Sequence, residues 1–150
     1  MEIVFIGGSK ENCDIAESMC MFAARKLMPR TCAKLFIEIE FVKNLYNDYG
    51  IYGDCTWDSH ERNPKDYIVR LDDNLSLEDL LATVAHEMVH VKQYATGELK
   101  QYSVQKGYRY KNDYYPIDYN IAYRPWEIEA SMLEKTLVNA WHKEFDEVLT

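Results

Sequence analysis

The chain has 150 residues, 47% hydrophobic and 28% charged, which suits one soluble globular domain with a hydrophobic core. No apolar run approaches the roughly 20 residues that span a bilayer, and the start MEIVFIGGSK lacks the features of a secretory signal. The net charge of −8 argues against a broad nucleic-acid-binding surface, since such surfaces need clustered Lys and Arg. We therefore expect one cytoplasmic domain over residues 1–150, with neither a membrane nor a nucleic acid as partner.

The first part of the chain predicts two strands separated by a helix. Ile3–Ile6 is a short apolar run before two glycines, which is typical of a strand and a turn. From about Asn12 to Met28, apolar residues recur at helical spacing until Pro29. Leu35–Val42 alternates strictly, so we expect a strand with one buried face and with its two glutamates on a solvated face.

The middle of the chain predicts a loop and then another strand. Leu45–Asn63 is rich in turn residues and is expected to be loop-like. Tyr67–Leu71 has the composition of a short strand. Because it directly precedes a long helix, we expect it to border a cleft, where free backbone groups can pair with an extended peptide.

Ser76–Gly97 is predicted to be one long helix, and it carries the most informative motif of the chain. A capping pattern begins it at Ser76, and Gly97 is a suitable end. Within it, His86-Glu87-Met88-Val89-His90 matches the HExxH pattern. Residues four apart lie on one helix face, so both imidazoles can bind a single metal ion. Glu87 lies about 100° further round, where a general base can take a proton without occupying a ligand position.

A helical wheel separates this helix into two faces. Its leucines, valines and Met88 form an apolar face for the core, whereas His86, Glu87 and His90 lie on a polar face. The alternative is two surface or core histidines without a metal. A chance match would usually fall in a loop or place its histidines on mixed faces, so the wheel favours a metal site.

Tyrosines are concentrated after this helix, where eight of the chain's 12 lie between Tyr94 and Tyr123. Tyr102–Lys111 predicts a hairpin around Lys106-Gly107, with Tyr108 and Tyr110 on one face. Residues 114–124 are aromatic and irregular. Such a segment either packs with its hydroxyls at the surface or forms a substrate-binding wall in which one hydroxyl stabilises an oxyanion.

Pro125 begins a second long helix that is expected to reach about Val148, since Pro suits the first helical position. A catalytic zinc ion usually has three protein ligands and a water, so a third ligand is needed beside the two histidines. The candidates are His60, His142, Cys55, Glu127 and Glu129. Cys55 lacks the EGCLS surroundings of the peptide deformylases, and the wheel does not choose between the two glutamates.

HEMVH on a helix, followed in the next helix by Glu127-Ile-Glu129-Ala130-Ser131, resembles the small gluzincin-like zinc metallopeptidases. These range from SprT-like to ImmA/IrrE-like and phage-encoded predicted peptidases, and the likeness covers Tyr67 to about Trp141. In the family pattern E-x-x-A-N/D, the first glutamate binds zinc and the residue four later supports a zinc-bound histidine. The resemblance therefore implies Glu127 as the third ligand and places Ser131 at the supporting position, where Asn or Asp is usual. The third histidine and zinc ribbon of SprT-like proteins are missing from the chain.

We thus expect an α+β, zincin-like domain: a small mixed or antiparallel sheet packed on an N-terminal helix, the HExxH helix and a C-terminal glutamate helix. The expected function is a Zn²⁺-dependent peptidase acting on a peptide or protein substrate by means of a metal-activated water. The expected site comprises the ligands His86, His90 and Glu127, the base Glu87, and the oxyanion groups Tyr119, Tyr123 or Arg124. Two alternatives are a non-catalytic protein-binding module with a structural or vestigial metal, and an amidohydrolase of deformylase type with Cys55 as a ligand.

Overall fold

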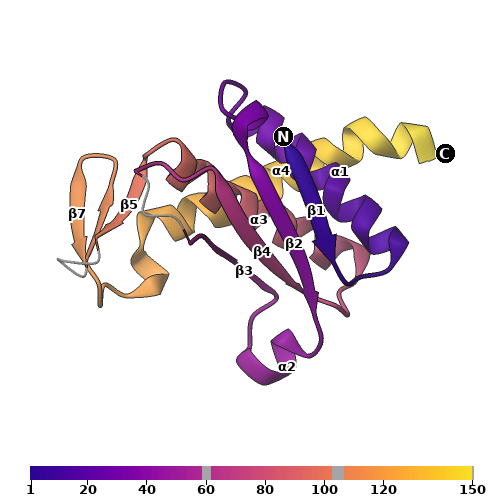
Figure 1. The fold of residues 1–150 in the computed structure, drawn as a ribbon, viewed down its shortest axis with the longest axis horizontal. Coiled ribbons are helices and arrows are strands. Elements are labelled where there is room, and N and C mark those ends of the chain that lie inside the picture. Colours follow the sequence, from indigo (N-terminus) through magenta and orange to yellow (C-terminus); the bar gives the residue numbers. More distant parts are fainter. Residues whose placement is uncertain (59–61, 103–106, 150) are drawn as a thin grey trace.

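The computed structural model describes residues 1–58, 62–102 and 107–149, and these form an α+β fold (Figure 1). Along the chain the elements are β1 (Glu2–Ile6), α1 (Lys10–Leu27), η1 (Cys32–Lys34), β2 (Phe36–Val42), α2 (Leu45–Tyr49), β3 (Gly53–Thr56), β4 (Asp66–Asp72), α3 (Leu77–Ala95), β5 (Leu99–Tyr102), β6 (Gly107–Tyr110), β7 (Asp113–Pro116), η2 (Ile121–Tyr123) and α4 (Pro125–Leu149). The expected α+β class is confirmed. Among these residues, no helix has both the length and the apolar character needed to cross a bilayer.

The larger sheet is mixed, with the strand order β1-β2-β4-β3. β1, β2 and β4 run parallel, and β3 pairs antiparallel with β4 at one edge. The expectation that Tyr67–Leu71 borders the cleft with free backbone groups is wrong, because this segment lies in β4, which is paired on both sides by β2 and β3. The edge strand is β3, within a segment predicted to be a loop. Its four residues, Gly53–Thr56, are too few to show the alternation by which a strand is recognised.

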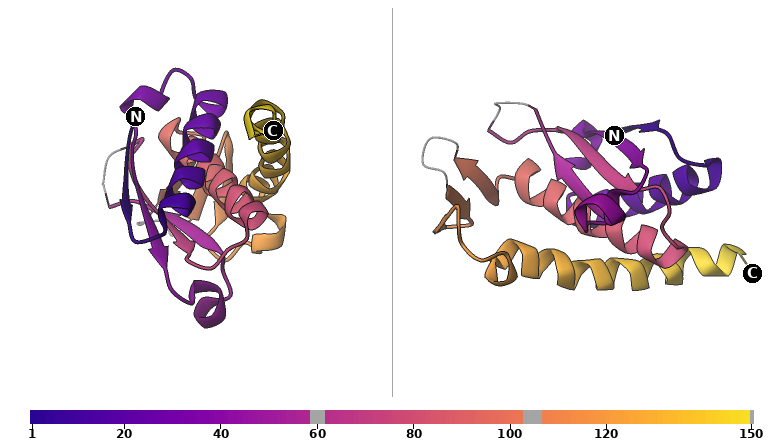
Figure 2. Two further views of the ribbon diagram at one scale, coloured as in Figure 1. Left: turned by 90° about the vertical axis from the view of Figure 1, so that its right-hand side faces the viewer. Right: turned by 90° about the horizontal axis from the view of Figure 1, so that it is seen from below.

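One face of this sheet packs against α1 and α3, and α4 packs on the far side of α3, so that the molecule has three layers (Figure 2). The alternating burial of β2 confirms the predicted buried face, which includes Ile37 and Ile39. Glu38 and Glu40 lie on the opposite, half-buried face, which no helix of the described chain covers. The core between the layers fixes α3 relative to both the sheet and α4.

The smaller sheet, β5-β6-β7, is antiparallel and lies at one end of the molecule, beside the start of α4 (Figure 1). Tyr108 and Tyr110 both pack against Trp126: the ring centroid of Trp126 lies 5.0 Å from that of Tyr108 and 5.8 Å from that of Tyr110. Their predicted common face is therefore confirmed. The prediction that residues 114–124 are irregular is wrong in part, because β7 lies there. Of the expected hairpin turn, Lys106 lies outside the described residues.

The predicted ends of the two long helices are confirmed. The Ser76 hydroxyl accepts a hydrogen bond of 3.2 Å from the backbone N–H of Asp79, which caps the start of α3. Gly97, with a φ of +81°, follows its end in the left-handed conformation that favours glycine. Pro125 is the first residue of α4. The HExxH motif therefore lies inside a well-defined helix rather than at a frayed end.

Candidate metal centre

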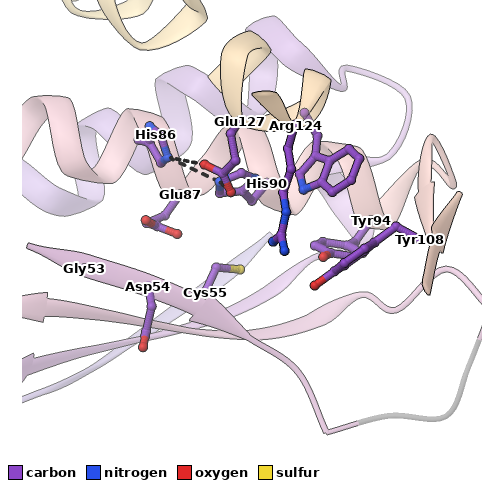
Figure 3. Close-up of a pocket in the computed structure, with 11 residues that line it drawn as sticks. Gly53, Asp54, Cys55, His86, Glu87, His90, Tyr94, Tyr108, Arg124 and Glu127 are labelled. Carbon is purple, nitrogen blue, oxygen red and sulfur yellow. Dashed lines mark hydrogen bonds and ion pairs between the residues drawn. The ribbon is translucent and has the colours of Figure 1, made fainter. Parts of the chain in front are cut away.

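The two helices α3 and α4 bring three potential metal ligands together. His86 and His90 lie one turn apart on α3, and Glu127 projects from the start of α4 towards both (Figure 3). The Nε2 atoms of the histidines are 3.3 Å apart. The Glu127 carboxylate oxygens lie 3.5 Å from Nε2 of His86 and 3.4 Å from Nε2 of His90. The structure thus places the three sequence-predicted ligands in one cluster.

The spacing of the two Nε2 atoms and the Glu127 carboxylate fits a bound metal ion. Bonds of about 2.0–2.1 Å at tetrahedral angles hold ligand atoms about 3.3–3.4 Å apart. The two Nε2 atoms are 3.3 Å apart, and each has a different oxygen of Glu127 near that distance: Oε2 lies 3.5 Å from His86 and Oε1 lies 3.4 Å from His90. Two imidazole nitrogens and a carboxylate oxygen also form a donor set that suits zinc and several other divalent ions. The residues present therefore fit a metal ion.

Each histidine is held from behind through its other ring nitrogen. Nδ1 of His86 lies 3.0 Å from Oε1 of Glu134, and Nδ1 of His90 lies 2.9 Å from Oε1 of Gln93. Both acceptors fix the tautomer in which Nε2 is free to bind a metal, which is the usual arrangement of metal-binding histidines. The supporting position that the family resemblance implied, Ser131, is exposed on α4, and Glu134 contacts the histidine in its place.

Glu129, the rival third ligand, is engaged elsewhere. Its Oε1 accepts a hydrogen bond of 2.9 Å from Nε2 of Gln93 and lies 3.5 Å from Nζ of Lys92. A hydrogen bond to Tyr110 also helps to hold the pKa of Glu129 below its usual value, against the effect of burial. Since these partners occupy the carboxylate, the geometry favours Glu127.

The remaining candidate ligands do not join the cluster. His142 lies further along α4 and pairs with Glu78 at 2.9 Å and with Asp146 at 3.1 Å. Cys55 lines the same cleft from β3, but within the described residues the metal-binding group comprises only the two histidines and Glu127. Burial, together with the charge of Glu87, raises the pKa of the Cys55 thiol well above its usual value and so disfavours the thiolate that a metal requires. His60 lies outside the described residues.

Glu87 lies beside the cluster without belonging to it. Only 6% of its surface is exposed, and no hydrogen bond or ion pair holds its carboxylate within the described chain. Burial raises the pKa of Glu87 to about 7, although the neighbouring charges of His90 and His86 act in the opposite direction. A carboxyl group with such a pKa can both accept and release a proton near neutral pH.

The three cluster residues perturb one another strongly when no metal is bound. Burial disfavours a charged His86, but hydrogen bonds to Glu127 and Glu134 outweigh it and raise the pKa of His86 to about 10. Burial also opposes ionisation of Glu127, yet the two histidines hold the pKa of Glu127 far below its usual range. In the metal-free cluster the raised pKa values of His86 and His90 favour protonated imidazoles beside an ionised Glu127.

An open cleft of about 310 Å³ leads to the cluster (Figure 3). Its lining combines the edge strand, the metal helix and an aromatic wall: Gly53, Asp54, Cys55, His86, Glu87, His90, Tyr94, Tyr108, Arg124, Trp126 and Glu127. Tyr119 and Tyr123, predicted as oxyanion groups, are absent from this lining. Tyr123 is 67% exposed, and Tyr119 packs its ring on Tyr115 and offers only its backbone carbonyl to Arg124.

Sequence reasoning gave no role to Gln93 and Glu134, which hold the two histidines, and it did not single out Tyr94 and Tyr108 from the tyrosine-rich segment as residues that line the cleft. Two signals were present in the chain. Glu134 follows Glu127 by seven residues, which is about two helical turns and returns to the same face of α4. Gln93 follows His90 by three residues on the polar face of α3, where neighbouring side chains meet. No such local signal places Tyr108, because its position depends on packing against Trp126.

Comparison of the chain with protein-family models, with curated proteins and with solved structures finds no match in any of the three. The function is therefore inferred from the geometry of the site.

Proposed function

We propose that this protein is a zinc-dependent peptidase with a zincin-like fold. The observation that supports it best is the convergence of two Nε2 atoms and one carboxylate within 3.3–3.5 Å of one another, beside a buried carboxyl group that is not itself a ligand. An HExxH helix facing a glutamate helix across a cleft is the arrangement that the resemblance to gluzincin-like peptidases implies. The mixed sheet, with its antiparallel edge strand β3 bordering the cleft, agrees with that architecture.

In this proposal His86, His90 and Glu127 hold the zinc ion and leave a fourth position open. When bound, zinc supplies a Lewis acid that lowers the pKa of a coordinated water towards neutrality and polarises the scissile carbonyl. Glu134 and Gln93 keep each imidazole in the required tautomer and orientation.

Glu87 acts as the general base and then as the general acid. Its carboxylate takes a proton from the attacking water and delivers it to the leaving nitrogen, so the same side chain must change protonation state twice in each turnover. In the metal-free protein, burial raises the pKa of Glu87 to about 7, although the charges of His90 and His86 lower it. The hydroxyl groups available in the cleft to stabilise the oxyanion are those of Tyr94 and Tyr108.

The outer edge of β3 is proposed to bind the peptide backbone. β3 pairs with β4 on one side only, and Gly53, Asp54 and Cys55 border the cleft. The unpaired backbone groups of an edge strand can bind an extended peptide as an additional strand. A peptide held in this way runs along β3, with its carbonyl groups directed alternately towards β3 and away from it.

The two alternative functions have less support. A structural zinc ion is usually enclosed by four protein ligands, whereas the described residues supply three and place an uncommitted Glu87 beside them. A deformylase-type amidohydrolase would be favoured by a cysteine ligand, and Cys55 is not part of the cluster.

The proposal is tested by Glu87→Gln, which keeps the size of the side chain but removes the base. We expect the variant to retain zinc while cleavage of a peptide library, followed by mass spectrometry, falls by about 10²-fold or more. Glu40→Gln, on the opposite face of the sheet, is the matched control and should cleave like the parent. Equal activity of the Glu87→Gln and parent proteins would reject the mechanism.

A further inference from the structure

Arg124 is the only lysine or arginine among the described residues that line the cleft. It lies immediately before α4, and its half-buried side chain descends between the metal-binding cluster and the aromatic wall formed by Tyr94 and Tyr108 (Figure 3). The protein as a whole carries a net charge of −8. A single cation in this position therefore offers a local binding point for an anionic group on a molecule that is negatively charged overall.

The Arg124 guanidinium is held in one orientation by groups that do not neutralise it. Nε donates to the carbonyl of Tyr119 at 2.9 Å, and Nη2 donates to the carbonyl of Ile117 at 3.1 Å. The flat face of the group lies 5.0 Å from the ring centre of Tyr108 and 5.7 Å from that of Trp126. Such stacking suits the planar guanidinium and lowers the entropy lost when it binds a ligand.

This orientation leaves one edge of the guanidinium available. Both backbone carbonyls use the Nε–Nη2 edge, whereas an arginine has five N–H donors in a fixed fork. No carboxylate pairs with Arg124 within the described residues. Of the three acidic residues in the cleft lining, Glu127 faces the two histidines, Asp54 pairs with Arg70, and Glu87 forms no ion pair with Arg124. The Nη1–Nη2 edge is thus free to bind a planar anion in bidentate fashion.

We propose that Arg124 determines specificity by binding a carboxylate of the peptide substrate, an inference that rests on the proposed peptidase function. The carboxylate belongs either to the free C-terminus of the substrate or to an Asp or Glu side chain near the cleaved bond. The preferred substrates are in both cases peptides with an anionic group, even though the overall charge of the protein would steer basic peptides towards it. Arg124 binds this group at a distance from the metal-binding cluster and so sets the register of the peptide.

Binding is measured on zinc-loaded Glu87→Gln protein, so that the result does not depend on cleavage. The probes are acetyl-Ala-Ala-Ala with a free acid or an amide end, and acetyl-Ala-Asp-Ala-amide compared with its Asn counterpart. We expect at least one acid to bind about tenfold or more tightly than its neutral partner, the usual scale for a charged hydrogen bond. The pair that shows the difference identifies the source of the carboxylate.

Adding Arg124→Gln to the Glu87→Gln protein should abolish the difference in affinity between acid and neutral probes. Adding Arg30→Gln, which lies outside the cleft, should preserve that difference. Arg124→Lys keeps the charge but loses the fork, so it should reduce the ratio several-fold, and it serves if Arg124→Gln does not fold. A ratio that survives in Arg124→Gln, or is unchanged in Arg124→Lys, would show that another group, such as the zinc ion, holds the carboxylate and would overturn the proposal. So would equal binding of acid and neutral probes by the Glu87→Gln protein.

The activity of the protein with an intact Glu87 separates this proposal from the proposed function. A specificity role predicts that Arg124→Gln lowers kcat/KM for acidic peptides by a larger factor than for neutral peptides, whereas an oxyanion role predicts an equal loss for both. An equal loss would overturn the assignment of Arg124 while leaving the peptidase intact. A protein that binds the acid probes through Arg124 but cleaves no peptide would instead refute the peptidase.

Discussion

Two glutamates near the start of α4, Glu127 and Glu129, face α3 only two residues apart, yet they lie in opposite environments. Glu129 meets Lys92 at 3.5 Å and the amide of Gln93 at 2.9 Å, so its charge is balanced by a cation of the chain itself. Glu127 meets two imidazoles that can bind a metal only when they are neutral. One cluster is complete, whereas the other, under the proposed function, would take its cation from outside the chain.

The comparison shows that the role of a carboxylate at a helix–helix contact depends on the side chains that face it. Gln93 makes this plain because it is fully buried and contacts both clusters. Its Oε1 holds Nδ1 of His90 and its Nε2 donates to Glu129. The closed cluster around Glu129 therefore positions the open cluster around Glu127. A substitution in the open cluster should mainly weaken metal binding, whereas one in the closed cluster should mainly lower the free energy of unfolding.

The largest expected effect is that of Glu127→Gln. Removing one of three charged or basic ligands should weaken zinc binding by about 10³-fold or more and abolish cleavage, because two histidines alone do not complete a catalytic site. Glu129→Gln is the matched control: it should keep zinc and lower the free energy of unfolding by about 1 kcal/mol, since the ion pair is lost but an acceptor oxygen remains. Zinc affinity by competition with a chelator and urea unfolding measure both. The reverse pattern would make Glu129 the ligand.

A smaller effect is expected for Glu134→Ala, which removes the acceptor behind His86. Loss of such a partner typically weakens metal binding by about 10–100-fold, because the imidazole loses its fixed tautomer and orientation. Ser131→Ala, at the position that the family pattern implies, should leave zinc affinity unchanged because its side chain is exposed. Chelator competition measures the zinc affinity of the parent, Glu134→Ala and Ser131→Ala proteins and shows which of the two side chains supports His86. Equal weakening by Ser131→Ala would restore the family pattern.

The sequence predicted the helical side of the site better than the sheet side. The spacing of His86 and His90 is local and periodic, so the helix alone determines that they share a face. The choice between Glu127 and Glu129 came from a family resemblance, since their separation depends on how α4 packs on α3. β3 and Tyr108 carry no local signal, because a four-residue edge strand and a stacked ring are fixed by partners distant in the chain.

The smallest expected effect concerns pH and the protons that occupy the open cluster. In the metal-free protein, the raised pKa of His86 contributes stability that is fully present below its usual 6.5 and is lost as the pH rises through about 10. The lowered pKa of Glu127 contributes stability that is present above its usual 4.5 and is lost in stronger acid. The metal-free cluster is therefore most stabilising between the two usual pKa values, from pH 4.5 to pH 6.5.

Zinc should reverse this dependence above that window, because it displaces protons from the histidines. At pH 7 we expect the release of about one proton or more per zinc ion, so that affinity rises about tenfold per pH unit for each proton released. Calorimetric titrations in buffers of different ionisation enthalpy count the protons. His142→Gln tests the site assignment, since the pKa of His142 is also raised, by Asp146 and Glu78, but far from the cluster. The number of protons released should be the same in the His142→Gln variant as in the parent. Zinc binding without proton release would show that the histidines of the metal-free protein are already neutral. The clusters around Glu127 and Glu129 would then differ less than their geometry indicates.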